Sequence, residues 1–151
     1  MDAASRFRLL PMVPRDPHEG GRVASSLELF FDLVFVVGVS ISASELHHAL
    51  SAGHIASGLA SFAAVFFAIW WAWMNFTWFA TSFDTDDWLY RVLTILQMGG
   101  VLLLASGVQP AFEEHDFSVV VMAYVVMRLA MVAQWLRASR HAGGARAATL
   151  T

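Results

Sequence analysis

The chain contains four apolar runs, each close to the length that an α-helix needs to cross a lipid bilayer. A hydrocarbon core of about 30 Å requires about 20 apolar residues in a helix. Strands are excluded, because open sheet edges leave backbone polar groups without partners in hydrocarbon. The sequence therefore predicts an all-α integral membrane protein with about four transmembrane helices, at residues 27–44, 55–79, 88–108 and 117–136.

Composition supports this fold class and excludes several kinds of chemistry. The chain is 58% hydrophobic and 14% charged, whereas soluble domains are nearer half apolar and a quarter charged. Every basic residue is arginine, so a Schiff-base lysine and a phosphate-loop lysine are absent. There is no cysteine, which excludes disulfides, thiolate catalysis and cysteine-ligated zinc. The sequence also offers no nucleophile–base pair, no HExxH motif and no phosphate loop, so we expect no enzyme activity. No cofactor and no metal are expected.

The distribution of arginine predicts the orientation. Arginines are concentrated before the first span and after the fourth, and Arg91 follows the second span, whereas the loops 45–54 and 109–116 contain no Lys or Arg. Positive charge marks cytoplasmic segments, so both termini are expected in the cytoplasm. The terminal arginines are then topology signals, and no nucleic-acid binding is expected.

These signals divide the chain into three parts. Residues 1–26 lack the apolar stretch of a secretory signal and are expected to form a flexible cytoplasmic tail. Residues 27–138 are expected to form the four-helix transmembrane region. Residues 139–151 are expected to form a second cytoplasmic tail, which ends early enough to suggest a truncated chain.

Each span carries a polar residue on its cytoplasmic half. Asp32 is about 9 Å from the predicted boundary at a rise of about 1.5 Å per residue, and Arg128 is about 12 Å from it. The other predicted depths are similar, and Glu28 shares a helix face with Asp32 because the two are four residues apart. We therefore expect a polar layer, a candidate functional site, made of Glu28, Asp32, Asn75, Gln97 and Arg128.

An ion pair between Asp32 and Arg128 is the sharpest expectation for this layer. An unpaired arginine at that depth costs at least ~2.5 kcal/mol on insertion scales, and a carboxylate would relieve that cost. One interpretation is that the pair only fixes helix packing. The other is a proton-coupled carboxylate or a ligand site.

An acidic motif, Asp84-Thr85-Asp86-Asp87, precedes the third span. Asp84 or Asp86 is expected to cap that helix, because acids are favoured at helix starts. Arg91 is expected to pair with these acids or with Glu28. A divalent-cation site is an alternative, since hard cations prefer carboxylate oxygens.

The two loops without arginine contain histidines and acids. These residues are typical of zinc sites and pH sensors, but a solvated polar surface is the simpler interpretation. The residues are His47, His48, His54, Glu113, Glu114, His115 and Asp116.

The second span carries alanine at every fourth position. Small residues at this spacing permit close approach of two helices in lipid, although alanine is also common in membrane helices. The stripe consists of Ala56, Ala60, Ala64, Ala68 and Ala72.

Several motifs together resemble the bacterial low temperature requirement protein A family. They are the ELFFDLVF string at 28–35, the WWAW string at 70–73, Asp84-Thr85-Asp86 with Arg91, Pro110-Ala111-Phe112, and Tyr124 with Arg128. The resemblance covers residues 22–146 and implies a multi-pass protein of the bacterial inner membrane. It implies no reaction. Members of this family are longer and have further spans, so the chain resembles their N-terminal part.

Two kinds of function remain open at this stage. A transporter-like or channel-like protein would use the polar layer, because intramembrane ionisable residues are functional candidates. A non-catalytic membrane component in cold or stress adaptation would use its helix surfaces to assemble with itself or with other membrane helices, and a piece of a longer protein would be inactive alone. The lipid bilayer is the expected partner in every case.

Overall fold

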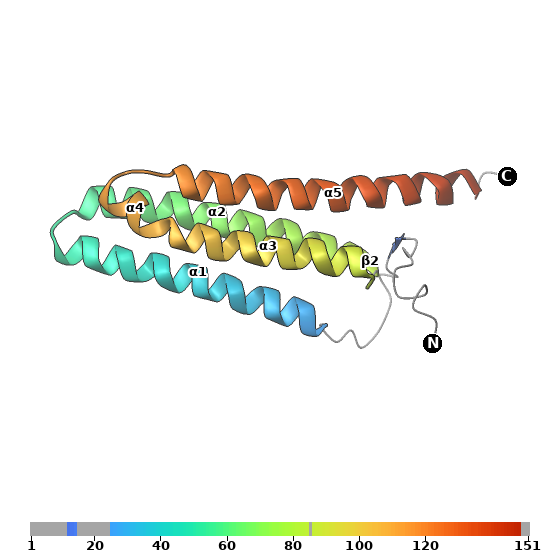
Figure 1. Ribbon diagram of the computed structural model, residues 1–151, viewed down its shortest axis with the longest axis horizontal. Coiled ribbons are helices and arrows are strands. Elements are labelled where there is room, and N and C mark those ends of the chain that lie inside the picture. The colour runs from blue at the N-terminus through green and yellow to red at the C-terminus, as the bar shows by residue number, and fades with distance from the viewer. Residues whose placement is uncertain (1–11, 15–24, 85, 149–151) are drawn as a thin grey trace.

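A computed structural model describes residues 12–14, 25–84 and 86–148, and it shows an antiparallel bundle of four long helices (Figure 1). The four helices are long and apolar enough to span a membrane. The predicted all-α fold is confirmed for the described residues, apart from one pair of two-residue strands. The long helices are α1 (Ser26–Ser51), α2 (Ile55–Ser82), α3 (Trp88–Ser106) and α5 (Ser118–Ala148).

The helices differ from the predicted spans mainly at their ends. α1 continues seven residues beyond the predicted end at residue 44, and α5 continues to Ala148, within the segment predicted as a C-terminal tail. An apolar run marks the part of a helix that lies in lipid, whereas polar helix formers prolong the helix beyond it. A short helix, α4 (Val108–Glu113), was not predicted. The predicted N-terminal tail lies largely outside the described residues.

Side-chain caps fix where two of the helices begin. The Ser25 hydroxyl accepts a hydrogen bond from the Glu28 backbone N–H at 3.2 Å, and the Asp87 carboxylate accepts one from the Tyr90 N–H at 2.9 Å. Each cap satisfies a backbone donor that has no partner inside the helix. Asp87 therefore caps α3, and the prediction that Asp84 or Asp86 does so is wrong.

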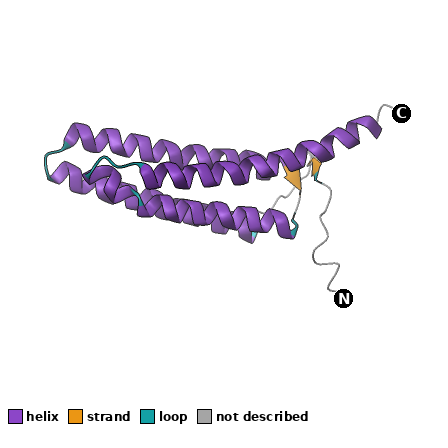
Figure 2. Cartoon of the chain, turned by 45° about the horizontal axis from the view of Figure 1, so that its top comes forward, coloured by secondary structure: helices purple, strands orange, loops and turns teal. Residues whose placement is uncertain are grey.

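A small antiparallel pairing joins the segment before α1 to the α2–α3 connection. β1 (Val13–Pro14) pairs with β2 (Phe83–Asp84), with Val13 opposite Asp84. Met12, beside β1, is buried. We call this end of the bundle the β2 end and the opposite end, which holds α4 and the α1–α2 turn, the α4 end (Figure 2).

The helices pack in an order that separates α1 from α5. α3 packs mainly on α5 and on α1, while α2 packs mainly on α1. In Figure 1, α2 and α3 lie between α1 and α5. The core is rich in aromatic rings at the β2 end, where Phe31 of α1 stacks on Phe76 of α2 with ring centroids 3.6 Å apart.

The outer surface of the bundle is apolar, as a lipid-facing surface should be. Large hydrophobic side chains of every long helix are exposed, among them Phe30, Phe67, Ile95 and Leu129. In the alanine stripe of α2, only Ala72 is buried, while Ala56, Ala60 and Ala64 are exposed. The stripe is therefore not the packing face of α2 within this chain.

Candidate functional site

The Asp32 carboxyl group lies on α1 where it meets α2. Its Oδ1 accepts a hydrogen bond from the indole Nε1 of Trp73 at 2.8 Å. Asp32 is exposed in the bundle, and it lines a cavity of about 360 Å³ between α1 and α2 whose walls are mainly apolar. Within the described part of the chain, Asp32 has no ion-pair partner. One carboxylate oxygen of Asp32 is therefore hydrogen-bonded, and the carboxyl group borders the apolar cavity, which we call the α1–α2 groove.

Glu28 lies one turn from Asp32 on the same side of α1. Both residues line a second, smaller cavity of about 70 Å³, together with Trp73 and Thr77 of α2. The predicted shared face of the two acids is therefore found. Thr77 donates its hydroxyl hydrogen to the Trp73 carbonyl at 3.0 Å, so its donor stays within α2.

The other members of the predicted layer gather on the far side of α2. Asn75, Gln97 and Arg128 line one narrow space with Ala72, Met127 and Met131. The single predicted layer is thus two groups, one between α1 and α2 and one among α2, α3 and α5.

The predicted ion pair between Asp32 and Arg128 is absent, and the packing order gives the reason. Asp32 is on α1 and Arg128 is on α5, which lie on opposite sides of α2 and α3. Arg128 instead donates from Nε to the Tyr124 hydroxyl at 2.8 Å, and its guanidinium carbon lies 4.9 Å from the Tyr124 ring centroid. This placement offers a cation–π contact in place of a carboxylate. Depth along a helix does not determine which side of the bundle a residue faces.

The α3–α5 interface contains a buried polar ladder that was not predicted. Gln97 donates to Gln134 at 3.1 Å, and Gln134 donates to the Thr94 hydroxyl at 3.5 Å. One turn nearer the β2 end, Arg137 donates to Asp87, and both residues are buried, with 9% and 5% of their surfaces exposed. These side chains pair with one another inside the bundle, as most buried polar groups do.

The sequence did contain a signal for this ladder. Asp87, Thr94 and Gln97 follow a spacing of seven and three, and Gln134 and Arg137 are three apart. Such spacings place side chains on one face of each helix. Arg137 was interpreted as a topology signal alone, so its pairing with Asp87 was not predicted.

The acidic motif forms one of the expected pairs. Arg91 donates from Nε and Nη2 to the two carboxylate oxygens of Asp86, each at 2.7 Å. The hydrogen bond from Arg91 holds the pKa of Asp86 below its ordinary value. Both side chains are exposed. The side chain of Asp84 lies outside the described residues, so its predicted pairing with Arg91 stays a prediction.

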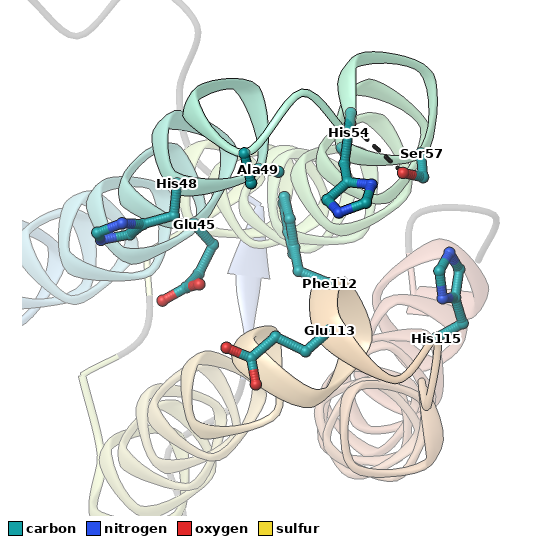
Figure 3. Close-up of a pocket in the computed structure, with 10 residues that line it drawn as sticks. Glu45, His48, Ala49, His54, Ser57, Phe112, Glu113 and His115 are labelled. Atoms are coloured by element: carbon teal, nitrogen blue, oxygen red, sulfur yellow. Dashed lines mark hydrogen bonds between the residues drawn. The ribbon is translucent and has the colours of Figure 1, made fainter.

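The α4 end has a cavity of about 350 Å³ lined by residues of both arginine-free loops (Figure 3). Glu45 and His48 come from α1, His54 from the turn, and Glu113 from α4. His115 follows α4 with a left-handed φ of 57°, a conformation in which histidine is enriched among non-glycine residues. Among the described residues, no three histidine or acidic side chains lie close enough to hold one metal ion.

The family pattern described as bacterial low temperature requirement A protein (LtrA) matches residues 23–151. The chain belongs to the LtrA family. It is therefore a bacterial multi-pass membrane protein, in agreement with its four long apolar helices, and the resemblance inferred from its motifs is confirmed.

One curated relative of this LtrA chain is "Uncharacterized protein RA0937" of Rhizobium meliloti (strain 1021). The two are 36% identical over 91 residues, which are 60% of this chain and 21% of that protein. The aligned region thus spans about a fifth of the relative's length. No solved structure matches the LtrA chain.

Proposed function

We propose that this LtrA chain takes part in transporter-like or channel-like passage of protons or other small cations across the bacterial inner membrane. The observation that carries the proposal is the Asp32 carboxyl group, which lies within a span, borders a groove and pairs with no cation among the described residues. Ionisable groups at this depth are costly and mark ion or proton pathways by default.

The geometry around Asp32 suits reversible binding. The Trp73 N–H engages one carboxylate oxygen, which leaves the other oxygen to take a proton or to approach a cation. Glu28 lies about 6 Å nearer the β2 end, at a rise of about 1.5 Å per residue. The two acids therefore form two steps of a path between the β2 end and the α1–α2 groove.

The direction of this path follows from the proposed orientation. Arg91, Arg137 and Arg140 lie toward the β2 end, whereas the loops at the α4 end contain no Lys or Arg. The positive-inside rule then assigns the β2 end and both termini to the cytoplasm. Glu28 is the carboxyl group nearer the cytoplasm, and Asp32 is the deeper one.

Flux in proteoliposomes tests the proposal. The purified chain is reconstituted with an internal pH-sensitive dye, and proton entry is followed after a pH step. Asp32→Asn should reduce the flux at least tenfold, and Trp73→Phe should reduce it less because the carboxyl group remains. Glu114→Gln, which removes a charge at the exposed α4 end, is the control and should leave the flux unchanged. Equal flux for Asp32→Asn and the unmodified chain would exclude the proposed role of Asp32.

The second candidate function is a scaffold that assembles with copies of itself or with other membrane helices. The observation in its favour is the exposed part of the alanine stripe, at Ala56, Ala60 and Ala64, because small residues permit close helix approach in lipid. Replacing Ala60 by Phe should then abolish self-association, measured by energy transfer between labelled chains in vesicles, and should leave proton flux unchanged.

A further inference from the structure

The cavity at the α4 end joins two carboxyl groups from different parts of the chain. Glu45 lies on α1 and Glu113 on α4, and both side chains extend toward the space between these helices (Figure 3). Glu45 is half-buried and has no hydrogen-bond partner among the described residues, whereas Glu113 accepts a hydrogen bond from Gln109 at 3.2 Å. A half-buried carboxylate without a partner has unused capacity to accept hydrogen bonds.

The surroundings of these carboxyl groups favour a positively charged ligand. The loops that surround the cavity contain no Lys or Arg, so no cationic side chain competes for Glu45 or Glu113. An anionic ligand would face two carboxylates without a counter-charge. The cavity is also larger than a single ion needs, since about 300 Å³ is the lower end for pockets that hold organic ligands.

The cavity wall distinguishes an organic cation from a metal ion. No three histidine or acidic groups in the described chain converge as metal ligands would, and the aromatic ring of Phe112 forms part of the wall. An ammonium group has three N–H donors, and the carboxylates of Glu45 and Glu113 are acceptors for them. Aromatic rings also attract ammonium ions and pack against their carbon chains.

We propose that the cavity at the α4 end binds a small organic ammonium ion, with Glu45 and Glu113 as its anionic acceptors and Phe112 as its apolar wall. The turn that shapes one side of the cavity is tightly built. Gly53 has a φ of +83°, which favours glycine, and at Gly58 an added Cβ would lie 2.8 Å from the Ala49 Cβ. α1 and α2 therefore pack closely next to Glu45 and His48, where Gly58 faces Ala49.

Three probes of one shape test the charge preference. Benzylamine, benzyl alcohol and benzoate are titrated separately into the full chain in detergent micelles at pH 7.5, and binding is measured by calorimetry. Benzylamine should bind at least tenfold more tightly than benzyl alcohol, and benzoate should not bind. Equal affinity for benzylamine and benzyl alcohol would overturn the proposal, because micelle partition or an apolar pocket would then explain the signal.

Matched variants test the site. Glu45→Gln and Glu113→Gln should each weaken benzylamine binding about tenfold, as expected when a charge-assisted hydrogen bond is lost, and the double variant should abolish it. Glu114→Gln is the control, since Glu114 is exposed at the same end but does not line the cavity. An equal loss of binding in Glu114→Gln would show that only the general negative charge matters, which contradicts the proposal.

The site is independent of the proposed transport pathway, and one variant separates the two. Asp32→Asn should bind benzylamine with unchanged affinity, whatever its effect on proton flux. Circular dichroism and size-exclusion profiles identical to those of the unmodified chain establish that each variant is folded. Weak binding in Glu45→Gln together with these unchanged profiles supports the site directly.

Discussion

Arg137 on α5 donates hydrogen bonds to Asp87, the residue that caps α3, so a single carboxylate starts one helix and ties it to another. The Arg137 Nη1 lies 2.9 Å from the Asp87 Oδ1, and Nη2 bonds to Oδ2. Asp87 also accepts the Tyr90 backbone N–H. Because both charges are buried, each depends on the other for compensation.

Breaking this pair from one side should destabilise the bundle strongly. Asp87→Asn keeps an acceptor for the helix cap but leaves the Arg137 charge buried without a counter-ion. We expect a loss of about 3 kcal/mol in the free energy of unfolding, measured by SDS titration in mixed micelles followed by circular dichroism.

A double variant tests whether charge compensation is the cause. Asp87→Asn with Arg137→Leu removes both charges and should recover most of the lost stability, because buried ion pairs are often replaceable by apolar groups. Additive losses in the double variant would mean that the two residues act separately.

The exposed pair of Asp86 and Arg91 should contribute much less and should depend on pH. Its hydrogen bonds lower the pKa of Asp86 in the folded state from the ordinary 3.8. The folded state therefore gains stability above that ordinary pKa and loses it as the pH falls through the lowered value. Because both side chains are exposed, Asp86→Asn should cost less than ~1 kcal/mol at pH 7.

Thermal unfolding of the unmodified chain and of Asp86→Asn measures this effect. The two melting temperatures should differ slightly at pH 7 and converge as the pH falls through the lowered pKa of Asp86. A difference that grows on acidification would contradict the assigned direction of the pKa shift.

Replacement by alanine should change the stability in opposite directions at Gly99, which lies in α3, and at Gly107, which caps the end of α3. At Gly107 an added Cβ would lie 2.8 Å from the Val119 Cβ and 3.1 Å from the Val120 backbone nitrogen, whereas nothing lies within 4 Å at Gly99. Gly107→Ala should cost about 1–3 kcal/mol through overpacking. Gly99→Ala should stabilise by up to ~1 kcal/mol through helix propensity.

The same SDS titration compares the two variants, with Gly99→Ala as the matched control. A loss of stability in Gly99→Ala equal to that in Gly107→Ala would mean that backbone freedom, not the contact with α5, determines the effect.

The absence of cysteine makes the proposed orientation directly measurable. Ser51→Cys at the α4 end and Ser82→Cys at the β2 end each introduce one exposed thiol. In intact cells a membrane-impermeant maleimide should label Ser51→Cys and should label Ser82→Cys only after permeabilisation. The reversed pattern would place both termini outside the cytoplasm.

The existence and order of the helices were predictable because lipid imposes a length and an apolar composition on each span. The partners of the polar side chains were not predictable in the same way. Asp32 and Arg128 have suitable charges and similar predicted depths, but α2 and α3 separate them. Their actual partners, Trp73 and Tyr124, contribute one N–H and one hydroxyl from side chains that sequence analysis treats mainly as apolar.

The cap at Asp87 was missed for a related reason. Three aspartates precede α3, and any of them satisfies the chemistry of a helix start. Asp87 differs from the other two because it pairs with Arg137 across the α3–α5 interface. This contact belongs to the tertiary structure and is not visible in the local sequence. The pairing of Arg91 with Asp86 was easier to predict because the two residues are only five positions apart at the start of α3.

The unequal lengths of the helices have a consequence for how the bundle sits in the bilayer. α3 has 19 residues and α2 has 28, which correspond to about 28 Å and 42 Å. The shorter helix matches a hydrocarbon thickness of about 30 Å almost upright, whereas the longer one must tilt or protrude. A thicker membrane therefore worsens the match for α3 first while it improves the match for α2, so a change in bilayer thickness acts differently on these two helices.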